Sequence, residues 1–455
     1  MASHHHDLVV VGTGSGNMVV DSSFAELDVA FVEEEQRFGG TCLNVGCIPT
    51  KMFAHTADLV SEIRAAGTFD VRAELAGVSW PAVRDRVFGR VDPIARDSRR
   101  SRADTDGVTV HTGTAVFTGP RELDVDGDRV TADRIVLAVG SRPVVPPPVT
   151  DSGLPYETSN SVMHLEEPPA RPVVLGGGYI AAELAHVFAS LGTDVTIVES
   201  ADTLLGGQDE QVASTFGELA ATRYTVHLGR ELTELRGTPG DLEIVLDDGT
   251  RIGADTLLVA TGRRPNGDRL DLAKAGVDTH DDGRIAVDEY QRTSAEGVWA
   301  LGDCSTPVPL KHVANREADV VRHNLLHPDD LRSTRHDVVP AAVFTDPQIA
   351  AVGATEAELR DRGVAYTRSS ADYADTAFGW ALEEPVGFCT LYADPTTGHL
   401  LGAHILGPDA PVLIQPLVVA MTVGIPAKDL VDQPYWIHPA LTEVVQQALL
   451  GLRSD

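Results

Sequence analysis

The sequence predicts an α/β fold built from two strand–glycine turn–helix units, followed by a C-terminal α+β region. Each unit begins with a buried apolar strand that runs directly into a glycine cluster, first at 7–17 and again at 172–183. From about Arg335 the pattern changes to mixed strands and helices. Because 455 residues exceed what one hydrophobic core usually supports, we expect several domains.

The composition excludes several classes of function. A formal net charge of −31 leaves no basic face for nucleic acid or an anionic membrane, and no apolar run is long enough to span a bilayer. Four cysteines indicate a reducing compartment, and the first seven residues lack a signal-peptide pattern, so a cytoplasmic protein is expected. With so little lysine, the acidity points to adaptation to high salt; an ordinary acidic protein is the alternative.

The first glycine turn reads Gly12-Thr-Gly-Ser-Gly-Asn17 and follows a strand, as dinucleotide sites do. Gly12 makes the turn, Gly14 and Gly16 keep it open to a pyrophosphate, and the N-terminus of a following helix is expected to face the phosphates. The usual third glycine is replaced by Asn17, which loosens the expected helix–strand packing. The next strand ends in three glutamates, one of which is expected to bind ribose hydroxyls.

A cysteine pair follows in the segment Gly39-Gly-Thr-Cys-Leu-Asn-Val-Gly-Cys-Ile-Pro-Thr-Lys51. The short loop between Cys42 and Cys47 can close into a disulfide only with a glycine-permitted backbone. Helix amides and Lys51 are both expected to lower the pKa of the Cys47 thiol. These features indicate a reactive dithiol. A structural disulfide is the alternative, and no metal site is expected, because the other two cysteines stand alone.

This segment resembles the redox-active segment of the flavin-dependent pyridine nucleotide–disulfide oxidoreductases, and the resemblance extends over essentially the whole chain. It implies two Rossmann-like domains for FAD and NAD(P), the second inserted in the first, and a C-terminal α+β dimerisation domain. The expected boundaries are 1–149 and 267–335 for the FAD domain, 150–266 for the NAD(P) domain and 336–455 for the dimerisation domain.

The resemblance also implies which residues contact FAD. By the spacing of the family, Glu34 is the acid that binds the ribose. Gly140 ends a strand that resembles a second FAD-contact segment, and Asp303 matches the aspartate that binds the ribityl chain. The full set of expected FAD contacts is Gly12, Gly14, Gly16, Glu34, Gly40, Thr41, Gly140 and Asp303.

The second turn is expected to bind the nicotinamide dinucleotide, with contacts at Gly176, Gly178, Ala181, Glu199 and Gly262. Two signals conflict over which dinucleotide it takes. Ala181, in the third glycine position, resembles the members that use NADPH. Glu199 ends the next strand, where a carboxylate accepts ribose hydroxyls and repels a 2′-phosphate, which favours NADH. We expect NADPH on the basis of the resemblance, with NADH as the alternative.

Four further residues match catalytic positions of the family. Tyr179 resembles the tyrosine that shields the flavin, and Glu183 resembles the glutamate that pairs with the lysine at position 51. The alternatives are a packing aromatic and an acid favoured by the helix dipole. His438 and Glu443 resemble the acid–base dyad that reaches the cysteine pair of the partner subunit, which implies a homodimer; the alternative is a satisfied core histidine. An apolar helix at 410–423 also favours an interface.

We therefore expect an enzyme that passes electrons from NAD(P)H through FAD to the cysteine pair. Cys47 is then the thiolate that contacts the flavin, Cys42 attacks the substrate disulfide, and His438 protonates the leaving thiol. The chain ends without the cysteine pair of mercuric reductases.

Several segments, 86–94 and 343–350 among them, resemble mycothione reductases, whereas the acidity favours a salt-adapted organism that uses γ-glutamylcysteine. The expected activity is reduction of bis-γ-glutamylcystine to maintain thiol redox balance. The alternatives are mycothione reduction, a dihydrolipoamide dehydrogenase subunit of an acyl-transfer complex, and a flavoprotein binding module without turnover.

Overall fold

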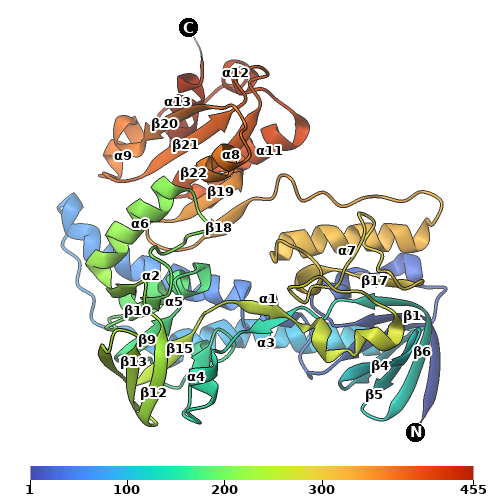
Figure 1. Ribbon diagram of the computed structural model, residues 1–455. Coiled ribbons are helices and arrows are strands. Elements are labelled where there is room, and N and C mark those ends of the chain that lie inside the picture. The colour runs from blue at the N-terminus through green and yellow to red at the C-terminus, as the bar shows by residue number, and fades with distance from the viewer. Residues whose placement is uncertain (1, 454–455) are drawn as a thin grey trace.

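The computed structural model describes residues 2–453 and has three regions. In Figure 1 the N-terminal region lies at the lower right, the middle region at the lower left, and the C-terminal region above them. The expected fold class is confirmed: two nucleotide-binding α/β regions, the second inserted in the first, precede an antiparallel α+β region.

The first region is built on a sheet with strand order β3-β2-β1-β6-β5-β4, in which β17 extends the edge of β6. Pairings among β1, β2, β3, β6 and β17 are parallel, and Leu8–Val11 at its centre is fully buried, as a strand covered on both faces requires. The strands are β1 (Ser3–Val11), β2 (Val29–Glu33), β3 (Val108–Thr112), β4 (Ala115–Gly119), β5 (Glu122–Val125), β6 (Asp128–Leu137) and β17 (Val298–Ala300).

The crossover from β1 to β2 contains no α-helix, so the prediction of a helix after the first glycine turn is wrong. Two short 3-10 turns, Gly16–Met18 and Ser22–Phe24, take its place. The Asp21 side chain accepts a hydrogen bond from the Ser23 amide and so caps the second turn. The packing role expected at Asn17 falls to Gly16, where a Cβ would come within 2.8 Å of the Ala138 side chain.

Helices cover the first sheet and connect it to the other regions: α1 (Gly40–Asn44), α2 (Cys47–Ala65), α3 (Trp80–Ala103) and α7 (Lys311–Leu326). Ser79 caps α3, whose buried residues recur at helical spacing. Apolar residues of α7 pack on the β1 face of the sheet, beside the 3-10 turns. Helix α7 therefore covers the part of this sheet face that the short crossover leaves uncovered.

Two short strands join the first and second regions. The chain leaves through β7 (Ser141–Pro143) and returns through β16 (Arg263–Pro265), and these strands pair with each other. Next come α4 (Pro147–Thr150) and β8 (Glu157–Thr158). The predicted boundary at residue 149 thus falls inside α4, and the domain boundaries stay predictions.

The second region has a parallel sheet of order β11-β10-β9-β15-β8 and a separate antiparallel sheet β12-β13-β14. Its strands are β9 (Pro172–Leu175), β10 (Thr196–Glu199), β11 (Thr225–Leu228), β12 (Leu232–Thr238), β13 (Asp241–Leu246), β14 (Arg251–Ala254) and β15 (Thr256–Val259). Here the glycine turn does open a helix, α5 (Tyr179–Ser190), and α6 (Glu210–Arg223) follows β10. Helices α2 and α5 pack side by side, which joins the first two regions.

The C-terminal region has an antiparallel sheet of order β18-β19-β22-β21-β20. Its strands are β18 (Ala341–Val343), β19 (Ile349–Gly353), β20 (Thr367–Asp372), β21 (Phe388–Ala393) and β22 (Leu400–Leu406). Its helices are α8 (Glu356–Asp361), α9 (Ala377–Ala381), α10 (Ala410–Leu413), α11 (Gln415–Val423), α12 (Ala427–Asp432) and α13 (Thr442–Gly451). The expected helix at 410–423 is two helices, with Val412, Val419 and Val423 at least half exposed.

Within residues 2–453, no helix combines the length and the apolar character needed to cross a bilayer. Within the same range, no three histidine, cysteine or acidic side chains come together as metal ligands.

Candidate active site

The cysteine pair lies where α1 ends and α2 begins. Gly39 and Gly40 have φ angles of 107° and 60°, a left-handed conformation that favours glycine. A Cβ at Gly46 would come within 2.9 Å of the Thr41 carbonyl oxygen, so this turn also needs glycine. Both cysteines are thiols in this structure; Cys42 is half-buried and Cys47 is exposed.

The two thiols differ in acidity because one hydrogen-bonds to the other. This hydrogen bond from Cys42, followed in decreasing order by Lys51, a backbone hydrogen bond and Lys311, lowers the pKa of Cys47 from 9.0 to about 7, although burial opposes the shift. The same hydrogen bond, with burial, raises the pKa of Cys42. At neutral pH the pair therefore consists of a partly ionised Cys47 and a protonated Cys42.

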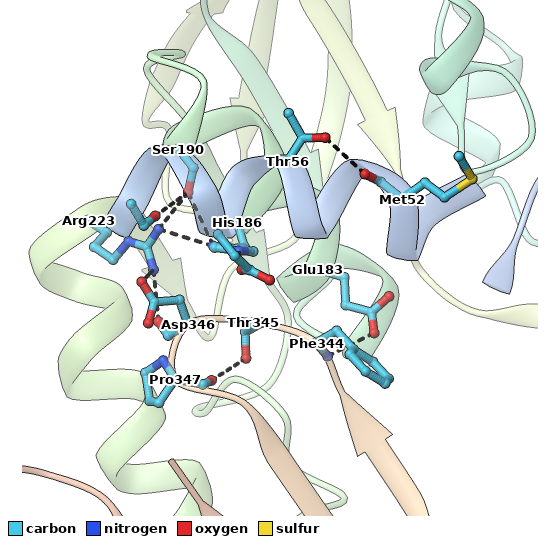
Figure 2. Close-up of polar contacts among 12 residues, drawn as sticks. Met52, Thr56, Glu183, His186, Ser190, Arg223, Phe344, Thr345, Asp346 and Pro347 are labelled. Atoms are coloured by element: carbon cyan, nitrogen blue, oxygen red, sulfur yellow. Dashed lines mark hydrogen bonds and ion pairs between the residues drawn. The ribbon is translucent and has the colours of Figure 1, made fainter. Parts of the chain in front are cut away.

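Lys51, one turn further along α2, forms an ion pair with Glu183 of α5. Its Nζ atom lies 2.6 Å from both carboxylate oxygens, and Glu183 is only 4% exposed. The backbone amide of Phe344 donates to the same carboxylate at 3.0 Å, and Figure 2 shows this contact. The expected pair thus forms, and it also ties the C-terminal region to the active site.

A polar network that the sequence motifs did not reveal continues along the α2–α5 contact. His186 is fully buried, with its Nε2 atom 2.7 Å from the Asp58 carboxylate. Arg223 of α6 approaches the other ring nitrogen at 3.2 Å and donates to the Asp346 carbonyl oxygen at 2.8 Å (Figure 2). His186 is one helical turn from Glu183, so the network supports the helix face that carries Glu183.

Tyr179 is the first residue of α5, and its side chain is 44% exposed. This exposure excludes the alternative of a packing aromatic in the core. Partial burial raises the pKa of its phenol, and the charges that act on it include those of Asp303, Glu183 and Cys47. The tyrosine therefore lies among the residues expected to surround the flavin ring.

The backbone around the first turn fits a pyrophosphate-bearing cofactor. A Cβ at Gly12, where φ is 96°, would collide with the Ala138 carbonyl oxygen. A Cβ at Gly40 would come within 2.8 Å of the Gly14 Cα, so the glycine turn and the start of α1 touch. Such a close, side-chain-free backbone is what a pyrophosphate needs. At the other end of the expected site, Asp303 accepts a hydrogen bond of 2.7 Å from Ser141.

The acid that contacts this turn is Glu33, so the geometry favours it over Glu34, and which of the two binds the ribose stays a prediction. Glu33 accepts hydrogen bonds from the Thr13 amide at 2.9 Å and from its hydroxyl at 2.6 Å. Glu34 instead forms an exposed ion pair with Arg269 at 3.2 Å. Glu33 ends β2, whereas Glu34 already lies in the following bend.

Three cations that sequence reasoning did not assign surround the first turn. Arg102 of α3 donates to the carbonyl oxygens of Asn17 and Val20, each at 2.7 Å. Arg322 of α7 donates to the Met18 carbonyl oxygen at 3.2 Å. Lys311, at the start of α7, donates to the Ser15 hydroxyl at 2.8 Å. The two arginines satisfy carbonyl groups that a crossover helix would otherwise have paired internally, and Lys311 holds the side chain of Ser15.

The second turn fits a second dinucleotide. A Cβ at Gly176 would come within 2.5 Å of the Ala260 carbonyl oxygen, whereas one at Gly178 would meet nothing within 4 Å. Gly262, which ends the neighbouring strand segment, has a φ of 119° and is also unobstructed. Glu199, at the end of β10, accepts a hydrogen bond from the Gly177 amide.

His438 and Glu443 form the expected dyad near the start of α13. The His438 Nδ1 atom lies 2.6 Å from the Glu443 carboxylate, which leaves the other ring nitrogen available. The His438 side chain is 71% exposed, which excludes a core histidine. Among residues 2–453 no hydrogen bond or ion pair joins this dyad to the cysteine pair of the same chain. The dyad thus faces outward from the region that carries the exposed valines of α10 and α11.

Comparisons with known proteins agree with this arrangement. The family model for pyridine nucleotide-disulphide oxidoreductases matches residues 6–318, and the model for their dimerisation domain matches 339–449. Mycothione reductase of Mycobacterium tuberculosis strain H37Rv is 48% identical over 98% of this chain and 99% of its own. Dihydrolipoyl dehydrogenase of Haloferax volcanii is 32% identical over 97% and 95%.

Solved structures give the same result. The Cu(II) complex of an HOCl-induced flavoprotein disulfide reductase from Escherichia coli matches with a TM-score of 0.87 and 26% identity, over 98% of this chain and 99% of that one. The chain therefore belongs to the pyridine nucleotide–disulphide oxidoreductase family, as a homodimeric disulfide reductase of low-molecular-weight thiols with FAD and NAD(P)H as cofactors.

Proposed function

We propose that the protein reduces mycothione, the disulfide of mycothiol. The identity of 48% to a mycothione reductase over nearly the full length of both chains supports this substrate. The dihydrolipoyl dehydrogenases of two haloarchaea, in contrast, are 32% and 33% identical. Bis-γ-glutamylcystine is the second candidate. The net charge of −31 favours a salt-adapted organism, and such an organism is expected to use γ-glutamylcysteine as its small thiol.

The mechanism depends on the different acidities of the two cysteine thiols. FAD, when bound, passes an electron pair from NAD(P)H to the Cys42–Cys47 disulfide. Because the pKa of Cys42 is raised, that thiol needs a base before it can attack the substrate. His438 of the partner subunit supplies the base, held in orientation by the carboxylate of the partner's Glu443.

The Cys42 sulfur attacks one sulfur of the substrate, and a mixed disulfide forms while the first thiol leaves with the proton held by the partner's His438. The Cys47 thiolate then attacks the Cys42 sulfur, which restores the internal disulfide and releases the second product as a thiolate, and this thiolate takes a proton from solvent. Lys51, paired with Glu183, keeps positive charge beside Cys47 during this exchange.

A panel of disulfides tests the substrate. The purified enzyme is assayed with mycothione, bis-γ-glutamylcystine, glutathione disulfide and lipoamide, at low and at molar salt. We expect the highest kcat/KM for mycothione, and a preference for lipoamide would refute a small-thiol substrate. Replacement of Cys42 by serine should abolish turnover of every disulfide while the flavin is still reduced by NAD(P)H.

A further inference from the structure

The first nucleotide unit holds its acid through a defined set of backbone contacts. The Gly12 amide donates to the Val32 carbonyl oxygen at 2.8 Å, which sets the turn against the end of β2. One carboxylate oxygen of Glu33 accepts from the Thr13 amide at 2.9 Å. The other accepts from the Glu35 amide at 3.3 Å. The carboxylate is thus fixed between the second residue of the turn and the second residue after the strand.

The second unit repeats the backbone contacts of this arrangement, although Gly177 has no hydroxyl to match that of Thr13. The Gly176 amide donates to the Val198 carbonyl oxygen, again at 2.8 Å. One carboxylate oxygen of Glu199 accepts from the Gly177 amide, and the other accepts from the Ala201 amide at 2.7 Å. Glu199 therefore occupies in the second unit the place that Glu33 occupies in the first.

The first unit shows which ribose this arrangement suits. The adenosine of FAD always carries free 2′ and 3′ hydroxyl groups and never a 2′-phosphate. A carboxylate at the end of the second strand accepts hydrogen bonds from such hydroxyls. We propose that Glu199, because it reproduces the geometry of Glu33, selects NADH over NADPH as the electron donor. The proposal refines the proposed reductase function and rests on it.

The segment that follows Glu199 adds no positive charge that could bind a 2′-phosphate. Residues 200–208 contain no lysine or arginine and include a further acid, Asp202. Arg230, whose amide donates to the Glu199 carbonyl oxygen, directs its guanidinium to Asp248, with Nε 2.8 Å from the carboxylate. A 2′-phosphate would therefore meet like charge, which costs affinity without any compensating contact.

The opposing signal in the sequence, Ala181, has a different physical meaning. Ala181 lies in the first turn of α5 and is fully buried in the core. The third glycine position governs how closely the helix packs on the strand, and it does not contact the 2′ position of the ribose. Ala181 thus reports on packing, and the acid at the end of β10 decides the specificity.

The test compares the two dinucleotides in binding and in turnover. With FAD-loaded wild-type protein, we expect kcat/KM for NADH to exceed that for NADPH by about a hundredfold or more. Calorimetric titration with NAD⁺ and NADP⁺ should give the same order of affinity. The Glu199→Gln variant, which keeps the shape and loses the charge, should reduce the preference by about tenfold or more. Glu199→Ser is a second variant in case glutamine disturbs the turn.

Glu234→Gln is the matched control, because it removes one exposed acid of the same region, which pairs with Arg236 at the surface. It should leave the ratio of the two dinucleotides unchanged. A wild-type preference for NADPH, or a ratio that neither Glu199 variant changes, would overturn the inference. Both outcomes leave disulfide reduction intact, whereas failure to reduce any disulfide with either dinucleotide would refute the proposed function instead.

Discussion

The hydrogen bond between the two thiols leads to a quantitative prediction for Cys42→Ala. That bond is the largest cause that lowers the pKa of Cys47 to about 7, and burial, the next largest, acts in the opposite direction. Without it, Lys51, a backbone hydrogen bond at Cys47 and Lys311 remain as the contributions that oppose burial, so the pKa of Cys47 should rise to about 8 or higher. At pH 7 the thiolate fraction then falls from about one half to about one tenth or less.

The assay is the rate of Cys47 alkylation by iodoacetamide as a function of pH, on reduced protein with flavin bound and after its removal. Only the thiolate reacts, so the rate rises as pH increases through the pKa. The midpoint is the quantity to compare, because a thiolate of higher pKa is also more nucleophilic, which partly offsets the loss of rate at one pH. We expect the Cys42→Ala midpoint to lie about one pH unit or more above that of the wild type.

Three variants bracket this result. Cys42→Ser keeps a donor and should shift the midpoint less. Lys51→Met should raise it, because Lys51 is the largest cationic contribution. Lys274→Met removes the same charge from an exposed ion pair with Asp271 and should leave it unchanged. An unchanged midpoint in Cys42→Ala would refute the assignment of the proton to Cys42, and with it the need for a histidine base.

Four further outcomes follow from the site. Glu33→Gln should weaken FAD binding about tenfold, measured by fluorescence titration, whereas Glu34→Gln should not; the reverse order would restore the choice made by spacing. Glu183→Gln should lower the free energy of unfolding by about 2 kcal/mol in a urea titration, since it leaves a partly exposed lysine without its partner, and no loss would mean that the pair is not structural. His438→Gln should reduce kcat/KM for the disulfide about 10²-fold or more while stopped-flow reduction of the flavin is unaffected; equal loss in both half-reactions would contradict an acid–base role. Arg102→Met should increase FAD dissociation, and retention as tight as in the wild type would show that the short crossover needs no such support.

The sequence predicts those parts of the fold that depend on local pattern. Leu8–Val11 and Pro172–Leu175 are continuous apolar runs before glycines, and both become central parallel strands. The crossover after Asn17 could not be predicted, because its conformation depends on Arg102 and Arg322, which come from helices far away in the sequence. A local pattern carries no signal for such contacts.

In the site, too, the sequence predicts what a local motif marks and does not predict what depends on distant contacts. The cysteine motif and its lysine predict a reactive pair, and the structure provides the ion pair to Glu183 as expected. Glu33 and Glu34 could not be separated, because neighbouring residues at the end of a strand point to opposite faces and a shift of one residue exchanges them. The buried His186 belongs to no motif, and only the packing of α2 on α5 reveals its role.

The support of the first glycine turn by α7 has a consequence for biosynthesis. Lys311 and Arg322, which hold Ser15 and Met18, leave the ribosome only after the entire nicotinamide region has been made. At about 5–20 residues per second, translation needs tens of seconds to reach them. In a nascent chain that ends before α7 the first turn lacks these two contacts, so we expect flavin to be captured only after α7 has emerged, when the inserted region has already had time to fold.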